Sequence, residues 1–174
     1  MRRGAASVGA WVAAAGAGLV GCASDPSRGY SFAGSRPAGV TTVAVPIFAN
    51  GTFAHGLEVD LTDAIIKEIQ STTDWRVVPG DASTTLSGTI TRATQRTLSS
   101  TRLGGLTQDM AVVLTVDFMW KDNRSGRTLA ARKDFTATDS FVPARRVGEP
   151  IEVGQHGAVQ EMARDIVAEL RSNW

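Results

Sequence analysis

Residues 110–121 read MAVVLTVDFMWK and form the most regular alternation in the chain. Large apolar side chains occupy one parity of this segment: Val112, Leu114, Val116, Phe118 and Trp120. Successive side chains of a strand point to opposite faces of a sheet, so the pattern predicts a strand with one fully apolar face. Each such side chain stabilises the fold by roughly 1.5–3 kcal/mol when fully buried, before chain entropy is subtracted. We expect this strand to be the spine of the core.

The segments around this strand predict a sheet. The turn sequence DNRSG at 122–126 leads into residues 127–138, which we expect to return as an antiparallel partner in a long hairpin. Residues 84–97 alternate apolar with Thr and Ser side chains, which is typical of a strand with one face in water. Residues 75–78 predict a short strand, and the β-branched run 40–47 predicts another, at an edge because Pro46 interrupts it.

Two further segments show apolar residues at helical spacing. Residues 55–71 carry one apolar stripe, and a second stripe lies near the carboxyl end after a polar loop at 139–150. The second stripe consists of Val159, Met162, Ala163, Ile166, Val167 and Leu170. A single apolar stripe needs a sheet to cover it. We therefore predict an α+β fold in β-α-β-β-β-β-α order, with two amphipathic helices packed on one face of a mainly antiparallel sheet of four to five strands.

The first 21 residues predict a targeting segment. Arg2 and Arg3 precede an uncharged run from Ala5 to Val20, the length of a signal-peptide apolar region. Leu19-Val20-Gly21-Cys22 then resembles the bacterial lipobox, in which the cysteine becomes the acylated first residue of the mature chain. The alternatives are an ordinary secretory signal with an incidental cysteine and a twin-arginine export signal. We predict a lipoprotein signal peptide at 1–21, an acylated tether at 22–39 and a single domain at 40–174.

The composition excludes several classes of function. Lys and Arg total 18 against 17 Asp and Glu, so there is no excess positive charge for a nucleic-acid backbone. One cysteine forms no internal disulfide, and with two histidines set far apart it makes no ordinary zinc site. His55 and His156 fit surface positions at helix ends better than a general base, and no Gly-rich phosphate loop follows a strand. We predict a protein that is not an enzyme and has no metal or cofactor beyond a lipid on Cys22.

Four arginines remain as candidate ligand contacts. They lie at the ends of predicted strands: Arg96, Arg102, Arg145 and Arg146. Guanidinium groups bind phosphates and carboxylates in a forked geometry, so these residues suit an anionic glycolipid or an acidic partner surface. The alternative is that they only keep the loops soluble.

The order of motifs resembles one family. The chain has the lipobox, Gly29-Tyr30-Ser31-Phe32 in the tether, the strand sequence VAVPIF at 43–48 before an acidic amphipathic helix, LSGTI at 86–90, the strand 110–120 and a helical carboxyl end. Together these resemble the lipopolysaccharide-assembly lipoprotein family LptE. Members usually place the Gly-aromatic pair directly behind the cysteine, whereas residues 23–28 intervene here.

The resemblance implies a role without chemistry. An LptE-like protein sits inside the outer-membrane barrel LptD, assists its assembly, plugs its lumen and contacts lipopolysaccharide on its way to the cell surface. Arg102 is then the first candidate for a lipopolysaccharide contact, followed by Arg145 and Arg146. Ala23 stands where an inner-membrane retention signal would carry Asp, so by resemblance the chain is anchored at the periplasmic face of the outer membrane.

Residues 43–52 also look like the opening of other periplasmic lipoproteins, which regulate peptidoglycan synthesis or form part of a secretion assembly. The long hairpin over 110–138 favours LptE over that alternative. A carrier of soluble cargo would need a roomy apolar cavity, which the low aromatic content of 6% disfavours.

Overall fold

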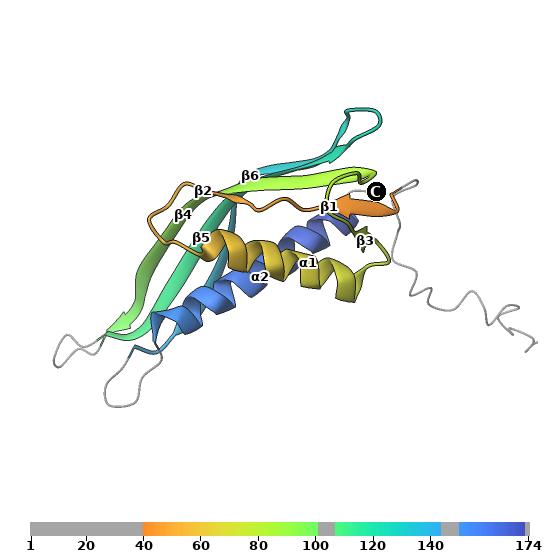
Figure 1. Ribbon diagram of the computed structural model, residues 1–174. Coiled ribbons are helices and arrows are strands. Elements are labelled where there is room, and N and C mark those ends of the chain that lie inside the picture. Colours follow the sequence, from red (N-terminus) through yellow and green to blue (C-terminus); the bar gives the residue numbers. More distant parts are fainter. Residues whose placement is uncertain (1–39, 101–106, 144–149, 173–174) are drawn as a thin grey trace, which may run out of the picture. The chain divides into compact units, whose positions relative to one another are not determined.

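The computed structural model describes residues 40–100, 107–143 and 150–172. Figure 1 shows two helices lying over the same side of one sheet, which confirms the predicted α+β class. The elements are β1 (Thr42–Ala44), β2 (Ala49–Asn50), α1 (Leu57–Thr72), β3 (Arg76–Val77), β4 (Thr84–Ser100), β5 (Thr107–Asp122), β6 (Thr128–Phe141) and α2 (Ile151–Ser172). The order matches the prediction except for β2, a short additional strand that lies just after the predicted strand at 40–47.

The sheet is mixed and has six strands. Its order is β3-β1-β4-β5-β6, and β2 lies beside β4 on the same side as β1. The long pairs β4–β5 and β5–β6 are antiparallel, as predicted for the hairpin. The three short strands add parallel pairs, because β1 and β2 both run alongside β4 and β3 runs alongside β1.

The extra strand arises at Pro46, between β1 and β2. Val43 pairs with Thr84 before the break and Ala49 pairs with Thr89 after it, so the chain follows β4 on both sides of the proline. Proline has no N–H to donate to a ladder. The next buried residue, Phe48, turns its N–H away from the sheet and donates it to Thr62 Oγ1 in α1 at 3.1 Å. This bond fixes α1 against the break.

The apolar face of β5 is the centre of the core, as its sequence predicts. Val112, Leu114, Val116, Phe118 and Trp120 are all buried. Both helices cover this face with the buried side chains Leu61, Ile65, Ile69, Met162, Ile166 and Leu170. The Trp75 ring packs on the Trp120 ring with centroids 5.0 Å apart, which ties the end of α1 to the sheet.

The end of β6 differs from the prediction, whereas the start of α2 agrees with it. Strand β6 continues to Phe141, so the residues 139–141 at the start of the predicted loop are paired with β5 through Asp139, Ser140 and Phe141. Phe141 is buried, and this apolar contact extends the strand through a polar sequence. Helix α2 begins at Ile151, directly after Pro150, which suits a helix start because its fixed φ is already helical.

The hairpin turn between β5 and β6 is held by Asp122. Its Oδ1 accepts the backbone N–H groups of Arg124 at 2.8 Å and Ser125 at 2.9 Å. Gly126 completes the turn with a positive φ of 72°. These N–H donors, the Ser125 N–H first, hold the pKa of the Asp122 carboxyl below its usual value.

Gly88 allows the closest approach in the sheet. A Cβ on this residue would lie 2.7 Å from the carbonyl oxygen of Asp117 and would overlap the buried ring of Phe48. We expect Gly88→Ala to lower the free energy of unfolding by about 1–3 kcal/mol, the usual cost of overpacking. Urea denaturation measures this loss.

The matched control is Ser87→Ala on the adjacent, half-buried position. It should change the free energy of unfolding by no more than about 0.5 kcal/mol. Equal stability of Gly88→Ala and the wild-type chain would show that Phe48 yields freely.

Candidate functional site

Of the predicted site residues, only Arg96 lies in the described part of the chain. Cys22, Arg102, Arg145 and Arg146 lie outside the described residues. Arg96 is exposed on β4 and pairs with Ala111 of β5. We therefore build the candidate site outward from the part of β4 that carries Arg96.

The sheet face away from the helices is rich in hydroxyl groups. We call it the open face. By the strand register it consists of Thr85, Ser87, Thr89, Arg92, Thr94 and Arg96 on β4, Ala111, Val113, Thr115, Asp117 and Met119 on β5, and Ala131, Thr136, Thr138 and Ser140 on β6. Neither α1 nor α2 covers it (Figure 1). This confirms that 84–97 has one wet face.

A β-bulge decides where the arginines of β4 point. Ile90 pairs with Val116, but Arg92 pairs with Thr115, so Thr91 is an extra residue in the ladder. Strict alternation would place Arg92 and Arg96 on the helix side together with Ile90. The extra residue moves both guanidinium groups to the open face, where both are exposed. Arg92 was not among the residues singled out from the sequence, because the bulge has no sequence signal.

Beside this arginine pair, β4 has a free edge. β1 and β2 occupy that side of β4 up to Ile90, whose carbonyl oxygen accepts the Gly51 N–H at 2.9 Å. From Arg92 onward, no strand among the described residues pairs with β4 on this side, although β4 stays paired with β5 to Ser100.

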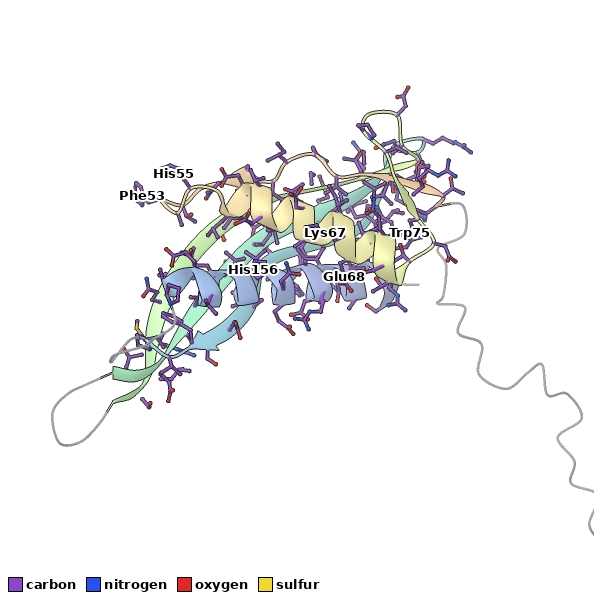
Figure 2. The ribbon with its side chains drawn as sticks, turned by 60° about the horizontal axis from the view of Figure 1, so that its bottom comes forward. Phe53, His55, Lys67, Glu68, Trp75 and His156 are labelled. Carbon is purple, nitrogen blue, oxygen red and sulfur yellow. The ribbon has the colours of Figure 1, made fainter. Side chains whose placement is uncertain are left out.

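A groove of about 500 Å³ lies along this free edge. One wall is the loop at 51–54, which follows β2, and the groove is also lined by Val112 of β5 and Gln155 of α2. The edge itself contributes residues 91–95. Phe53 has 99% of its surface exposed, and Figure 2 shows it beside His55 in the loop before α1.

Asn50 holds the groove wall in place. Its Nδ2 donates to the Ala54 carbonyl oxygen at 2.9 Å and to Glu58 Oε2 at 2.6 Å. Its Oδ1 accepts both the N–H and the Oγ1 hydroxyl of Thr52, each at 2.8 Å. A single amide side chain therefore ties both ends of the loop to the first turn of α1.

Glu58 completes this network at the start of α1. Besides Asn50, its Oε2 accepts the N–H of Gly56 at 3.1 Å. The pKa of Glu58 lies below its ordinary value because its own backbone N–H, then the Asn50 amide, the Gly56 N–H and the charge of nearby His55 favour the carboxylate. Three donors on one carboxylate make the wall depend on the charge of Glu58.

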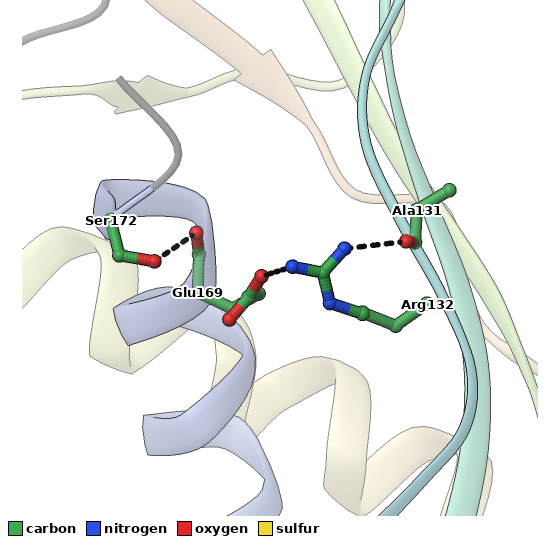
Figure 3. Close-up of polar contacts among 4 residues, drawn as sticks. All are labelled: Ala131, Arg132, Glu169 and Ser172. Atoms are coloured by element: carbon green, nitrogen blue, oxygen red, sulfur yellow. Dashed lines mark hydrogen bonds and ion pairs between the residues drawn. The ribbon is translucent and has the colours of Figure 1, made fainter.

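At the other edge of the sheet, α2 is fastened to β6 (Figure 3). Arg132 of β6 forms an ion pair with Glu169 of α2 and also donates to the Ala131 carbonyl oxygen at 3.0 Å. A register shift in β6 opposite Val116–Phe118 turns Arg132 toward the helix side, where Glu169 lies. This contact attaches the carboxyl-terminal part of α2 to β6.

The described residues show no cluster suited to a metal ion and no helix long and apolar enough to span a membrane. His55 and His156 are both exposed and lie on different elements (Figure 2). The two histidines are therefore where the sequence predicted them, near the starts of the helices.

The family model for lipopolysaccharide assembly, LptE, matches residues 40–173 of the chain. The chain belongs to the LptE family. The match covers every residue that the structure describes. Membership gives the chain a general role as a cell-envelope lipoprotein in lipopolysaccharide assembly.

Solved structures share the fold at low sequence identity. The hypothetical protein CT253 from Chlamydia trachomatis aligns with a TM-score of 0.53 at 10% identity, over 77% of this chain and 97% of that one. Protein XCC0632 from Xanthomonas campestris, of family DUF330, aligns with a TM-score of 0.52 at 11% identity, over 77% and 85%. These likenesses concern the fold alone. No curated protein matches the chain significantly.

Glu58→Gln tests the groove wall. Because the folded pKa of Glu58 is depressed, its carboxylate stabilises the fold fully above the ordinary value of 4.5, and this contribution is lost as pH falls through the folded pKa. We expect Glu58→Gln to be less stable than the wild-type chain at pH 7. The difference should shrink as the pH falls below about 4.5, as measured by urea unfolding at a series of pH values.

The control is Asp60→Asn, which neutralises an exposed carboxylate in the same turn without breaking a bond of the network. It should leave hydrogen exchange at the Gly56 N–H as slow as in the wild-type chain, whereas Glu58→Gln accelerates it. A stability difference that is constant with pH would contradict the assigned role of the carboxylate.

Proposed function

We propose that this protein is an outer-membrane lipoprotein that assists assembly of the LptD barrel, plugs its lumen and takes part in delivering lipopolysaccharide to the cell surface. The single observation that carries this proposal is the LptE family match over residues 40–173. The role is binding and gating and breaks no covalent bond, so the chain acts without catalytic residues or a cofactor.

The anchor in this proposal is a lipid on Cys22. A lipobox cysteine receives acyl chains on its sulfur and its new amino group, and burial of each methylene contributes about 0.8 kcal/mol to membrane affinity. One chain gives marginal binding, whereas several hold a protein at the membrane durably. The anchor leaves the domain at the periplasmic face, next to a barrel embedded in the same membrane.

The open face supports contact with a large partner. It carries short hydroxyl side chains along β4 and β6, with the exposed pair Arg92 and Arg96 at its margin. Thr and Ser side chains donate and accept hydrogen bonds, and an aqueous barrel lumen lined by polar groups offers complementary atoms. A polar face also keeps the domain soluble before assembly.

Cys22→Ala tests the anchor. We expect the variant to keep its signal segment and to lack acyl chains, so its mass differs from that of the processed wild-type chain. Mass spectrometry of the purified protein and fractionation of membranes check both points. An unchanged mass and an unchanged membrane fraction would contradict lipidation at Cys22.

Affinity purification tests the partner. A tagged full chain isolated from detergent-solubilised outer membrane should bring down a large β-barrel in about equimolar amount. Recovery of a peptidoglycan synthase in place of the barrel would support the alternative class of periplasmic lipoprotein and contradict our proposal. Cys22→Ala in the same purification reports whether capture needs the anchor.

Charge reversal tests the glycolipid contacts. A triple variant should weaken binding of purified lipopolysaccharide by about tenfold or more. It combines Arg102→Glu, Arg145→Glu and Arg146→Glu, and each substitution removes a charge-assisted bond to phosphate. Adding Arg96→Glu should weaken binding further, with Tm unchanged.

A matched control is Arg124→Glu with Arg127→Glu, at exposed positions of the turn between β5 and β6. This variant should bind lipopolysaccharide like the wild-type chain. Unaltered affinity in the triple variant would show that those arginines serve only solubility.

A further inference from the structure

We propose that the free edge of β4 from Arg92 to Thr97, with the groove beside it, binds an extended peptide segment of a partner protein. This segment would pair with β4 as an added strand and would alternate apolar with acidic side chains. We call residues 92–97 the docking edge. The inference does not depend on the barrel partner proposed above, because it concerns the edge and its groove alone.

The backbone of the docking edge has no partner strand among the described residues on the side of β2. The Gly51 N–H to Ile90 carbonyl bond of 2.9 Å is the last contact on the side of β2, and the chain then leaves the sheet at Thr52. Alternate residues of an edge strand point their N–H and C=O groups outward, where they are ready to pair with another chain. The ladder with β5 is regular from Arg92 to Thr97, between one register shift before Arg92 and another after Thr97. A straight segment can therefore pair along it.

The groove lies on the helix side of this edge. A strand that continued the line of β2 would place every second side chain in this groove of 500 Å³, next to Ala93, Gln95 and Val112. Phe53 stands in the wall with its ring almost wholly exposed. Because the Asn50 network holds that wall, little ordering is needed on binding, and an exposed aromatic side chain is a suitable anchor. The groove offers the apolar surfaces of Phe53, Ala93 and Val112 beside polar side chains, so it has room for an apolar side chain of the added strand.

The open face is positively charged beside the docking edge. The other side chains of an added strand would point to that face and lie beside Arg92 and Arg96. Neither arginine forms an ion pair with any described residue. Opposite charges on neighbouring strands attract and like charges repel, so the segment carries Asp or Glu at these positions. Alternating apolar and acidic residues satisfy both faces.

The edge of β6 is interrupted in its middle. Asp134 there has a left-handed φ of 51°, and its N–H donates to Asp117 Oδ1 of the already paired β5 at 2.8 Å. Next to it lie exposed Lys133 and Arg132, at a shift in register. Charges and bulges of this kind prevent strand addition there. On either side of this shift β6 is regular, and its outer edge is also unpaired among the described residues. The groove and the exposed pair Arg92 and Arg96 are therefore the reasons to assign the added strand to the docking edge.

A labelled peptide that alternates valine with glutamate tests the proposal on the full chain in detergent. Fluorescence anisotropy measures its affinity, and amide hydrogen exchange should slow at residues 92–97 when it binds. Two further peptides carry N-methyl groups on alternate amides, one on the odd and one on the even positions. Pairing through one edge predicts that one of them binds like the parent and the other about tenfold or more weaker, because it loses several backbone hydrogen bonds.

Charge-swap variants test the side-chain pattern. Arg92→Glu with Arg96→Glu should weaken the glutamate peptide by about tenfold and favour a peptide that alternates valine with lysine. The control Arg124→Glu with Arg127→Glu has the same change in net charge and should bind the glutamate peptide like the wild-type chain.

Three outcomes would overturn the proposal. The first is equal binding of both N-methylated peptides, and the second is unchanged hydrogen exchange at residues 92–97. The third is a dimer of the free chain in which these residues are already protected, which would assign the edge to a second copy.

Discussion

Burial of one face of β5 is the interaction on which the other elements depend. Both helices pack on Trp120, Phe118 and the smaller side chains of that face, and the neighbouring strands extend the buried surface on either side. A helix with a single apolar stripe gains most of its stability from such packing. Because α1 and α2 are both on this side, the opposite face is left to polar residues. The division into a packed face and an open face is thus a consequence of the pattern at 110–121.

The strength of this core allows irregularities elsewhere. Pro46 breaks the first strand, Thr91 is an extra residue in β4, and Asp134 adopts a left-handed conformation in β6. Each costs some ladder hydrogen bonding, and each has a local result. The break at Pro46 brings Phe48 to Thr62, the bulge turns two arginines outward, and the shift at Asp134 turns Arg132 toward the helix side.

The sequence predicted the fold well because its signals are local and periodic. The alternation at 110–121 and the helical stripes gave the elements, their order and the buried side chains. Boundaries were less accurate at Phe141, whose burial depends on contacts across the sheet. The candidate site was predicted only in part. Arg96 could be named from its charge, but the orientation of Arg92 depends on a bulge and the Asn50–Glu58 contact depends on how β2 meets α1. No periodic pattern encodes either.

The interrupted edge of β6 affects association between copies of the chain at high local concentration. Growth of a fibre by strand pairing requires two sheet edges on every copy that can each pair with a neighbouring copy. Asp134 and the charged residues around it divide the edge of β6 into two shorter regular stretches. Each stretch can pair over fewer residues than an uninterrupted strand, which weakens edge-to-edge association of copies.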